Sequence, residues 1–198
     1  LDQTDPHDPR YPLLGGVLKD ANWLHDMVEN ILSLTRLQDG QLALHKQAEA
    51  AEEILGSAVE HITRRYPAYD VAVHAPDELL FVPMDAKLII QVLINLLDNA
   101  VKHTPPPGEI SVTVAPGASG AVFTVTDNGS GIDERDLPHL FERFYTSPTR
   151  RADARSGIGL GLSICDAIVR AHGGTITARN RTDAPGAEFV FTLPLGGQ

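Results

Sequence analysis

Apolar residues recur at alternating spacings of three and four between positions 13 and 38, which predicts one long helix. The heptad seam of this helix consists of Leu14, Val17, Ala21, Leu24, Val28, Ile31 and Thr35. A single helix cannot bury such a seam alone, so it requires an antiparallel partner helix, a second subunit or both. Gly40 is a suitable helix stop, and the pattern changes after it. We therefore expect residues 1–40 and residues 41–198 to form separate units.

Beyond Gly40, helical and strand-like patterns follow one another along the chain. Helices are predicted at residues 52–65, 85–102 and 158–172. Strands are predicted at residues 42–47, 69–74, 79–82, 110–115, 121–126, 175–179 and 188–193. The strands come in pairs between helices and not in strict βαβ alternation. This order favours an α+β fold, a two-layer sandwich with a mixed sheet and helices on one face.

The helix predicted at 85–102, with Asp85 as its N-cap, carries a polar stripe on an otherwise apolar surface. The polar residues after its first turn fall within an arc of about 100°. They are Gln91, Asn95, Asp98, Asn99 and Lys102. Amide oxygens can bind a hard cation and a lysine can pair with phosphate, so the stripe suits a metal–phosphate group. A solvent-exposed helix face is the alternative.

Asp127 follows a predicted strand and precedes two glycines, Gly129 and Gly131. Because side chains alternate along a strand, Asp127 shares a face with Phe123 and Val125. A carboxylate among apolar side chains is costly unless donors bind it, and an adenine amino group is one candidate donor. The two glycines would let the backbone turn tightly and approach a flat ligand. A common Asn-Gly turn is the alternative.

A glycine-rich run at residues 157–162 leads into the last predicted helix. Glycines ahead of a helix N-terminus bring backbone N–H groups and the positive end of the helix dipole to a phosphate. The run does not fit the dinucleotide-binding fingerprint, because no strand ends directly before it. It also lacks the Gly-Lys-Ser/Thr of a P-loop, so neither common nucleotide-binding fold explains it.

Residues 146–156, just before this run, are cationic in a chain of formal net charge −10. Arg150, Arg151 and Arg155 stand there against Asp153. A cationic loop bounded by glycine is expected to form a lid that becomes ordered when nucleotide binds. An ordinary surface loop is the alternative.

The composition narrows the choice of partners. The net charge argues against DNA or an anionic membrane as a partner, so no nucleic acid and no membrane contact are expected. No apolar run reaches about 18 residues, so no membrane-spanning helix is predicted. The single cysteine, Cys165, excludes an internal disulfide framework, suits the cytosol and is expected to be a small core residue. Leu1 is not a natural start, so we expect a longer protein.

Four motifs occur in order along this chain. They are Asn95-x-x-x-Asn99, Asp127-x-Gly-x-Gly131, Phe141-Glu-Arg-Phe144 and Gly157-x-Gly-Leu-Gly-Leu162. Together they resemble the N, G1, F and G2 boxes of the histidine kinase catalytic domain, which shares the Bergerat ATP-binding fold with gyrase, the Hsp90 chaperones and MutL. The resemblance covers about residues 13–195 and implies a second dimerisation-bundle helix ahead of the sandwich. Segments beginning at Trp23, Leu55 and Val82 most resemble the KdpD potassium/osmosensing sensor kinases.

The resemblance implies a site for ATP and Mg²⁺. Asn99 would hold Mg²⁺ against the phosphates, and Asn95 would assist. Lys102 would reach the phosphates, and Arg143 is the candidate for the γ-phosphate. Asn95, Lys102 and Arg143 are therefore the expected catalytic residues.

The resemblance also implies the contacts to the base and the lid. Asp127 would take the adenine amino group in a pocket shaped by Gly129, Gly131 and Ile132. The other implied nucleotide contacts are His103, Phe144, Gly157, Gly159, Leu160, Gly161 and Leu162. The three glycines among them would face the triphosphate and form the hinge of the lid. His103 stands where the family often has tyrosine, and Thr146 where it often has arginine.

The implied function is transfer of the ATP γ-phosphate to a protein histidine, for relay to a response regulator. The implied partners are a response regulator, the phosphoacceptor helix of the same kinase and a second copy in a full-length homodimer, with this chain on the cytoplasmic side of a bacterial membrane sensor. The phosphoacceptor motif His-Glu/Asp-x-Arg-Thr-Pro-Leu does not occur here. Asn95 stands where hydrolysing relatives carry a glutamate base, and this favours transfer over an ATPase clamp. A nucleotide-binding module without catalysis is the other alternative.

Overall fold

The computed structural model describes residues 44–147 and 159–196. These residues belong to one compact unit, Leu42–Gln198. The helix predicted at 13–38 and the lid arginines lie outside the described residues, and the boundary predicted at residue 40 stays a prediction.

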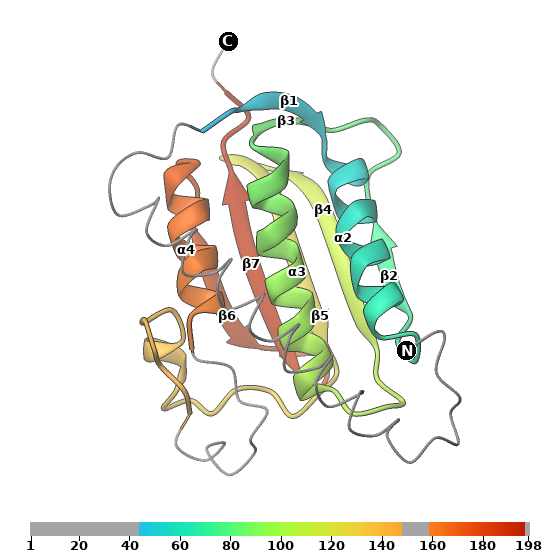
Figure 1. Cartoon of the computed structure of the whole chain (residues 1–198), viewed down its shortest axis with the longest axis vertical. Coiled ribbons are helices and arrows are strands. Elements are labelled where there is room, and N and C mark those ends of the chain that lie inside the picture. The colour runs from blue at the N-terminus through green and yellow to red at the C-terminus, as the bar shows by residue number, and fades with distance from the viewer. Residues whose placement is uncertain (1–43, 148–158, 197–198) are drawn as a thin grey trace, which may run out of the picture. The chain divides into compact units, whose positions relative to one another are not determined.

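A five-stranded sheet has the strand order β2-β4-β5-β7-β6 (Figure 1). Its strands are β2 (Val71–His74), β4 (Ile110–Gly117), β5 (Gly120–Asp127), β6 (Ile176–Asn180) and β7 (Ala187–Leu193). β2 runs parallel to β4, and the other neighbours are antiparallel. The sheet is therefore mixed, as predicted. A separate two-stranded sheet pairs β1 (Gln47–Ala50) with β3 (Phe81–Met84).

Three helices cover one face of the large sheet, with α3 between α4 and α2 (Figure 1). They are α2 (Ala51–Arg65), α3 (Ala86–His103) and α4 (Gly161–Ala171), and a short 3-10 helix, η1, spans Leu137–His139. Alternate side chains of the central strands point into this helical layer and are buried, and the stacked rings of Phe123 and Phe191 lie 4.6 Å apart there. The predicted two-layer sandwich is confirmed.

Several predicted element boundaries are wrong by two residues or more, and the largest errors are at β1 and α4. Residues 44–46 are not in a strand, and β1 begins only at Gln47, because its partner Met84 lies at the end of β3. The last helix begins at Gly161 and not at residue 158, since Gly159 has a φ of 74° and cannot lie inside a right-handed helix.

The start of α3 and the end of α4 are held together by hydrogen bonds. Asp85 caps α3 as predicted, with its carboxylate accepting from the Leu88 N–H at 3.4 Å. The buried His172 ring accepts from the Asp85 N–H through Nε2 at 3.0 Å, and its Nδ1 lies 2.8 Å from the Ile168 carbonyl oxygen. These contacts fix α4 against α3, and both helices carry predicted site residues.

Candidate nucleotide-binding site

Asn95 lies where α3 meets the first turn of α4. A β-carbon on Gly161 would stand 4.0 Å from the Asn95 amide carbon. The amide nitrogen of Asn95 is buried and has no hydrogen-bond partner among the described residues. Burial raises the pKa of the Cys165 thiol to about 12, although the neighbouring Asn95 amide, acting as a donor toward the sulfur, opposes this rise. Because a thiol sulfur is a weak acceptor, the buried amide of Asn95 remains suited to an incoming ligand oxygen.

The first turn of α4 has no side-chain cap. Its N-cap is Leu160, which is buried and offers no oxygen to the helix N–H groups. Uncapped N–H groups at a helix start attract anions, so the orphan amide of Asn95 and the start of α4 together suit a phosphate. Gly161 leaves this corner open, because it has no side chain between α4 and Asn95. Gly159 and Gly161 lie at the start of a helix, as predicted for this part of the glycine-rich run, and the contact with phosphate stays a prediction.

Asp127 is buried at the end of β5, and only 3% of its surface is exposed. Phe123 and Val125 are buried on the same face, as the alternation predicted. One carboxylate oxygen, Oδ1, accepts hydrogen bonds from the N–H groups of Gly129 at 2.9 Å and Ala187 at 3.2 Å. Within the described ranges no donor bonds to Oδ2. The carboxylate is thus held by its backbone neighbours, and one oxygen remains able to accept from an amino group.

Lys102 and Asp98 form an ion pair on the side of α3 that faces α2. Lys102 Nζ lies 2.5 Å from Asp98 Oδ2, and the Tyr66 hydroxyl donates to Asp98 Oδ1 at 2.6 Å. Burial raises the pKa of Asp98, but Lys102, Tyr66 and Arg65 together outweigh burial and hold that pKa below its usual value. The predicted stripe therefore divides, with Asn95 beside α4 and the ion pair beside α2.

Residues 84–197 match the family described as "Histidine kinase-, DNA gyrase B-, and HSP90-like ATPase". The chain belongs to this ATPase family. Its sequence relatives include sensor kinases, and its mixed sheet with a helical layer matches solved histidine kinase domains.

The relatives of this histidine kinase-type ATPase chain are much longer than the chain itself. Sensor protein KdpD of Clostridium acetobutylicum is 40% identical over 182 residues, which cover 92% of this chain and 20% of the relative. The adaptive-response sensory kinase SasA of a Nostoc species is 35% identical over 188 residues, covering 92% of this chain and 46% of the relative.

Solved histidine kinase structures have the same fold. The mycobacterial sensor histidine kinase MprB superposes with a TM-score of 0.66 at 29% identity, covering 75% of this chain and 97% of the other. The catalytic domain of histidine kinase ThkA superposes with a TM-score of 0.64 at 29% identity, covering 78% and 99%.

Two further residues of this ATPase site were missed by the sequence reasoning. The Asn180 side chain, at the end of β6, accepts from the Ile132 N–H at 2.7 Å and donates to the Ile132 carbonyl at 2.8 Å. Its Oδ1 also packs against Gly131. Ala187 supplies the second N–H to Asp127. An asparagine ending a strand is unusual and was the available signal, whereas a backbone donor has no sequence signal.

Gly129 is needed for a reason that differs from the predicted one. A β-carbon at this position would collide with the His103 carbonyl oxygen, at the end of α3. The same carbonyl accepts from the Ser130 N–H at 3.4 Å. Gly129 therefore lets the loop after β5 dock on α3, and this holds Asp127 and α3 together.

The F-box residues join the start of α4 through the backbone. Phe144 has a φ of 61°, is 65% exposed, and donates its N–H to the Gly159 carbonyl at 3.0 Å. Arg143 is exposed and forms no ion pair or hydrogen bond with the residues the structure describes. Its predicted γ-phosphate role stays a prediction, as does that of Gly157, which lies outside the described residues.

Metal binding would have to rest on few protein ligands. Among residues 44–147 and 159–196, no group of three or more His, Cys, Asp or Glu side chains is placed to hold a metal ion. Asn99 is half-buried on α3, and its side chain has no hydrogen bond to the described residues. An amide oxygen and phosphate oxygens together fit Mg²⁺, which keeps most of its water ligands.

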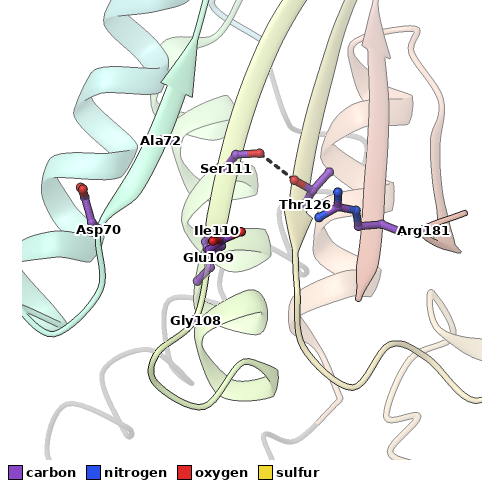
Figure 2. Close-up of a pocket in the computed structure, with 8 residues that line it drawn as sticks. All are labelled: Asp70, Ala72, Gly108, Glu109, Ile110, Ser111, Thr126 and Arg181. Atoms are coloured by element: carbon purple, nitrogen blue, oxygen red, sulfur yellow. Dashed lines mark hydrogen bonds between the residues drawn. The ribbon is translucent and has the colours of Figure 1, made fainter. Parts of the chain in front are cut away.

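A hollow of about 440 Å³ on the open face of the sheet is separate from the candidate nucleotide site (Figure 2). Arg181, Asp70 and Glu109 stand at its rim, and the Ser111 and Thr126 hydroxyls lie 2.6 Å apart on its floor. None of the predicted site residues lines it. The candidate nucleotide site is on the helical side of the sheet, where Asp127 points.

Proposed function

We propose that this chain is the ATP-binding catalytic region of a sensor histidine kinase and transfers the γ-phosphate of ATP to a protein histidine. The observation that carries the proposal is the buried Asp127 carboxylate, held through Oδ1 by two backbone N–H groups with Oδ2 left over. An adenine amino group would donate to Oδ2. The sensor kinase names of the relatives KdpD and SasA support the same function.

The phosphates would lie between α3 and the first turn of α4. The buried amide nitrogen of Asn95 would donate to a phosphate oxygen, and the uncapped N–H groups of α4 would receive another. Asn99 would supply an oxygen to Mg²⁺, which neutralises phosphate charge when it is bound. Lys102 would contribute a positive charge after leaving Asp98.

Asn95 also bears on the fate of the γ-phosphate. An amide cannot accept a proton from water near neutral pH, so this position supplies no general base for hydrolysis. The site would hold ATP for phosphoryl transfer and would not hydrolyse it. This reasoning favours a kinase over an ATPase clamp or a module that only binds nucleotide.

The partners follow from the function. One structural neighbour, ThkA, was solved in complex with the response regulator protein TrrA, and it superposes with a TM-score of 0.70 at 26% identity. We infer that this chain acts with a response regulator, with the phosphoacceptor helix of its own kinase, and as a homodimer in the full-length protein. We also infer a cytoplasmic position beneath a membrane sensor. None of the helices in the described part of the chain is long and apolar enough to cross a membrane.

Incubation with labelled ATP, with and without a helical bundle that carries the histidine box, tests the proposal. We expect acid-labile phosphate on the bundle and none on the chain alone, because transfer requires an acceptor nitrogen in line with the γ-phosphate. Asp127→Asn should reduce the transfer, and Asp77→Asn, at an exposed position away from the site, should not. Inorganic phosphate released without transfer would identify an ATPase instead.

A further inference from the structure

The ion pair with Asp98 occupies Lys102, a residue of the same polar stripe of α3 that carries Asn95. α3 lies between α4 and α2 (Figure 1). Asn95 faces the start of α4, whereas Asp98 is bonded to Tyr66, the residue that follows α2. Lys102 is drawn toward α2 by this pairing.

Of the two ion-pair partners, Asp98 is the more firmly held and Lys102 is the more exposed. The Asp98 side chain is only 16% exposed and is anchored by the Tyr66 hydroxyl, while the Lys102 side chain is 45% exposed. Arg65 lies over the Tyr66 ring, 5.5 Å from its centroid, and adds positive potential at Asp98. The carboxylate therefore stays ionised at neutral pH, and the ammonium group on its flexible stem is the partner that can move.

We propose that Asp98 competes with the nucleotide phosphates for Lys102, so that ATP binding replaces one counter-ion of this lysine with another. This inference rests on the proposed function of the site. A ligand gains only the difference between its own interaction with Lys102 and the interaction that it displaces. The Lys102–Asp98 pair thus sets the nucleotide affinity below the value that the same lysine would give without Asp98. Asp98 acts through Lys102 and does not itself contact the nucleotide.

A double-mutant cycle tests the competition, with Mg-ATP affinity measured by titration calorimetry on the whole chain. Asp98→Asn keeps an oxygen for the Tyr66 hydroxyl but loses the charge, and we expect it to tighten Mg-ATP binding about two- to fivefold, the range of a partly exposed ion pair. Lys102→Met should weaken binding. In the Lys102→Met background, Asp98→Asn should change nothing, because the effect passes through the lysine.

The control is Asp166→Asn on α4. Asp166 forms a similar ion pair with Arg170, four residues later on the same helix, with Arg170 Nε 2.7 Å from Asp166 Oδ1. It should leave the affinity unchanged. Thermal unfolding of each variant verifies that it is folded, and Asp98→Ser repeats the charge removal with a smaller side chain.

Three results would overturn the competition. One is an unchanged or weakened affinity in Asp98→Asn, and another is an unchanged affinity in Lys102→Met. The third is equal tightening by Asp98→Asn with and without Lys102, which would mean that the carboxylate simply repels the nucleotide. A wild-type chain that binds no Mg-ATP would instead remove the proposed function itself, and this inference with it.

Discussion

Two residues of this site, Asp127 and Asn95, each have one polar side-chain atom without a hydrogen bond to the described residues. Asp127 uses Oδ1 for two N–H groups and keeps Oδ2, and Asn95 keeps its buried amide nitrogen. The amide nitrogen of Asn95 would destabilise the empty protein, since a buried polar atom without a partner costs about 1–3 kcal/mol. A phosphate oxygen of ATP that accepts from Asn95 would recover this free energy, while the adenine amino group would donate to Asp127 Oδ2.

Replacing Asp127 with asparagine should weaken Mg-ATP binding by about 1.5–3 kcal/mol, because the charge-assisted hydrogen bond to the amino group is lost. Wild-type chain should bind Mg-GTP more weakly than Mg-ATP, since guanine presents a carbonyl where adenine has its amino group. Titration calorimetry measures both affinities, with Asp77→Asn as the exposed control. Equal affinities for the two nucleotides would refute the role of Asp127.

Replacing Asn99 with alanine should remove the Mg²⁺ dependence of ATP binding, because the metal loses its amide oxygen. Titrations of ATP with Mg²⁺ and with excess chelator give that dependence as a ratio of affinities. Lys87→Ala, an exposed position on the same helix, is the matched control and should retain the wild-type ratio. An Asn99→Ala chain with the wild-type ratio would make the polar stripe an ordinary solvated face.

The sequence allowed residues of the site to be predicted where the signal was local. The burial of Asp127 followed from strand alternation, and the polar stripe of α3 followed from helical periodicity. Asn180 lies 48 positions from Ile132, and Ala187 lies 60 positions from Asp127. Contacts over such separations depend on how β6 and β7 return to the sheet, and periodicity does not contain that information.

At the scale of elements, the site depends on how α4 is joined to its neighbours. At its start, Gly159 accepts the Phe144 N–H, and at its end His172 binds the N-cap of α3. The start of α4 was mispredicted because the glycine-rich run has an apolar pattern that continues the helix in sequence. The positive φ of Gly159, which arises from its pairing with the F box, ends that continuation.

A glycine-to-alanine pair separates backbone strain from helix propensity. Gly159→Ala should destabilise the chain by at least about 1 kcal/mol, because its φ of 74° is left-handed and a β-carbon would collide with the Tyr145 carbonyl. Gly56→Ala, inside α2 with no atom within 4 Å of the new β-carbon, should instead stabilise it by about 0.5–1 kcal/mol. Urea unfolding followed by circular dichroism compares the two variants. A Gly159→Ala chain as stable as wild type would contradict the requirement for glycine at position 159.

The His172 contact makes stability fall in mild acid. Burial lowers the pKa of His172 in the folded chain and Lys46 adds to this, against the opposing effects of the Ile168 carbonyl and Asp85. The unfolded chain therefore binds the proton first, and stability that is complete above about pH 6.5 is lost as the pH falls through the lowered folded value. Protonation at Nε2 would also set a donor against the Asp85 N–H.

Unfolding of wild type and His172→Phe between pH 7.5 and about pH 5 measures this loss. The variant should be less stable at neutral pH by about 1–3 kcal/mol, since the Asp85 N–H loses its acceptor. Its stability should also depend less on pH than that of wild type. His74→Gln, at an exposed position of β2, should keep the wild-type dependence. An unchanged pH dependence in His172→Phe would exclude this histidine as its source.

Across the whole described unit, the proposed ligand contacts come from segments far apart in sequence. They lie on α3, at the end of β5 and at the start of α4, while Ala187 at the start of β7 holds Asp127 in place. The two-layer sandwich was predictable because paired strands between amphipathic helices have few other ways to bury their apolar faces. Because the unfolded chain does not bring these segments together, a ligand that contacts them binds only the folded unit.

Nucleotide binding should therefore stabilise the unit as a whole. At free Mg-ATP of 100 times its measured dissociation constant, linkage predicts an increase of about 2.7 kcal/mol in the free energy of unfolding. Hydrogen exchange of amides in β5 and β7 measures this increase. Central strands are expected to open only on global unfolding, and their exchange should slow by the corresponding factor of about 100.

Asp127→Asn, compared at the same Mg-ATP concentration, should show a smaller increase that follows from its own affinity. If Mg-ATP binds and β5 and β7 exchange at the rate of the free chain, the nucleotide contacts a part of the protein that unfolds independently of this core.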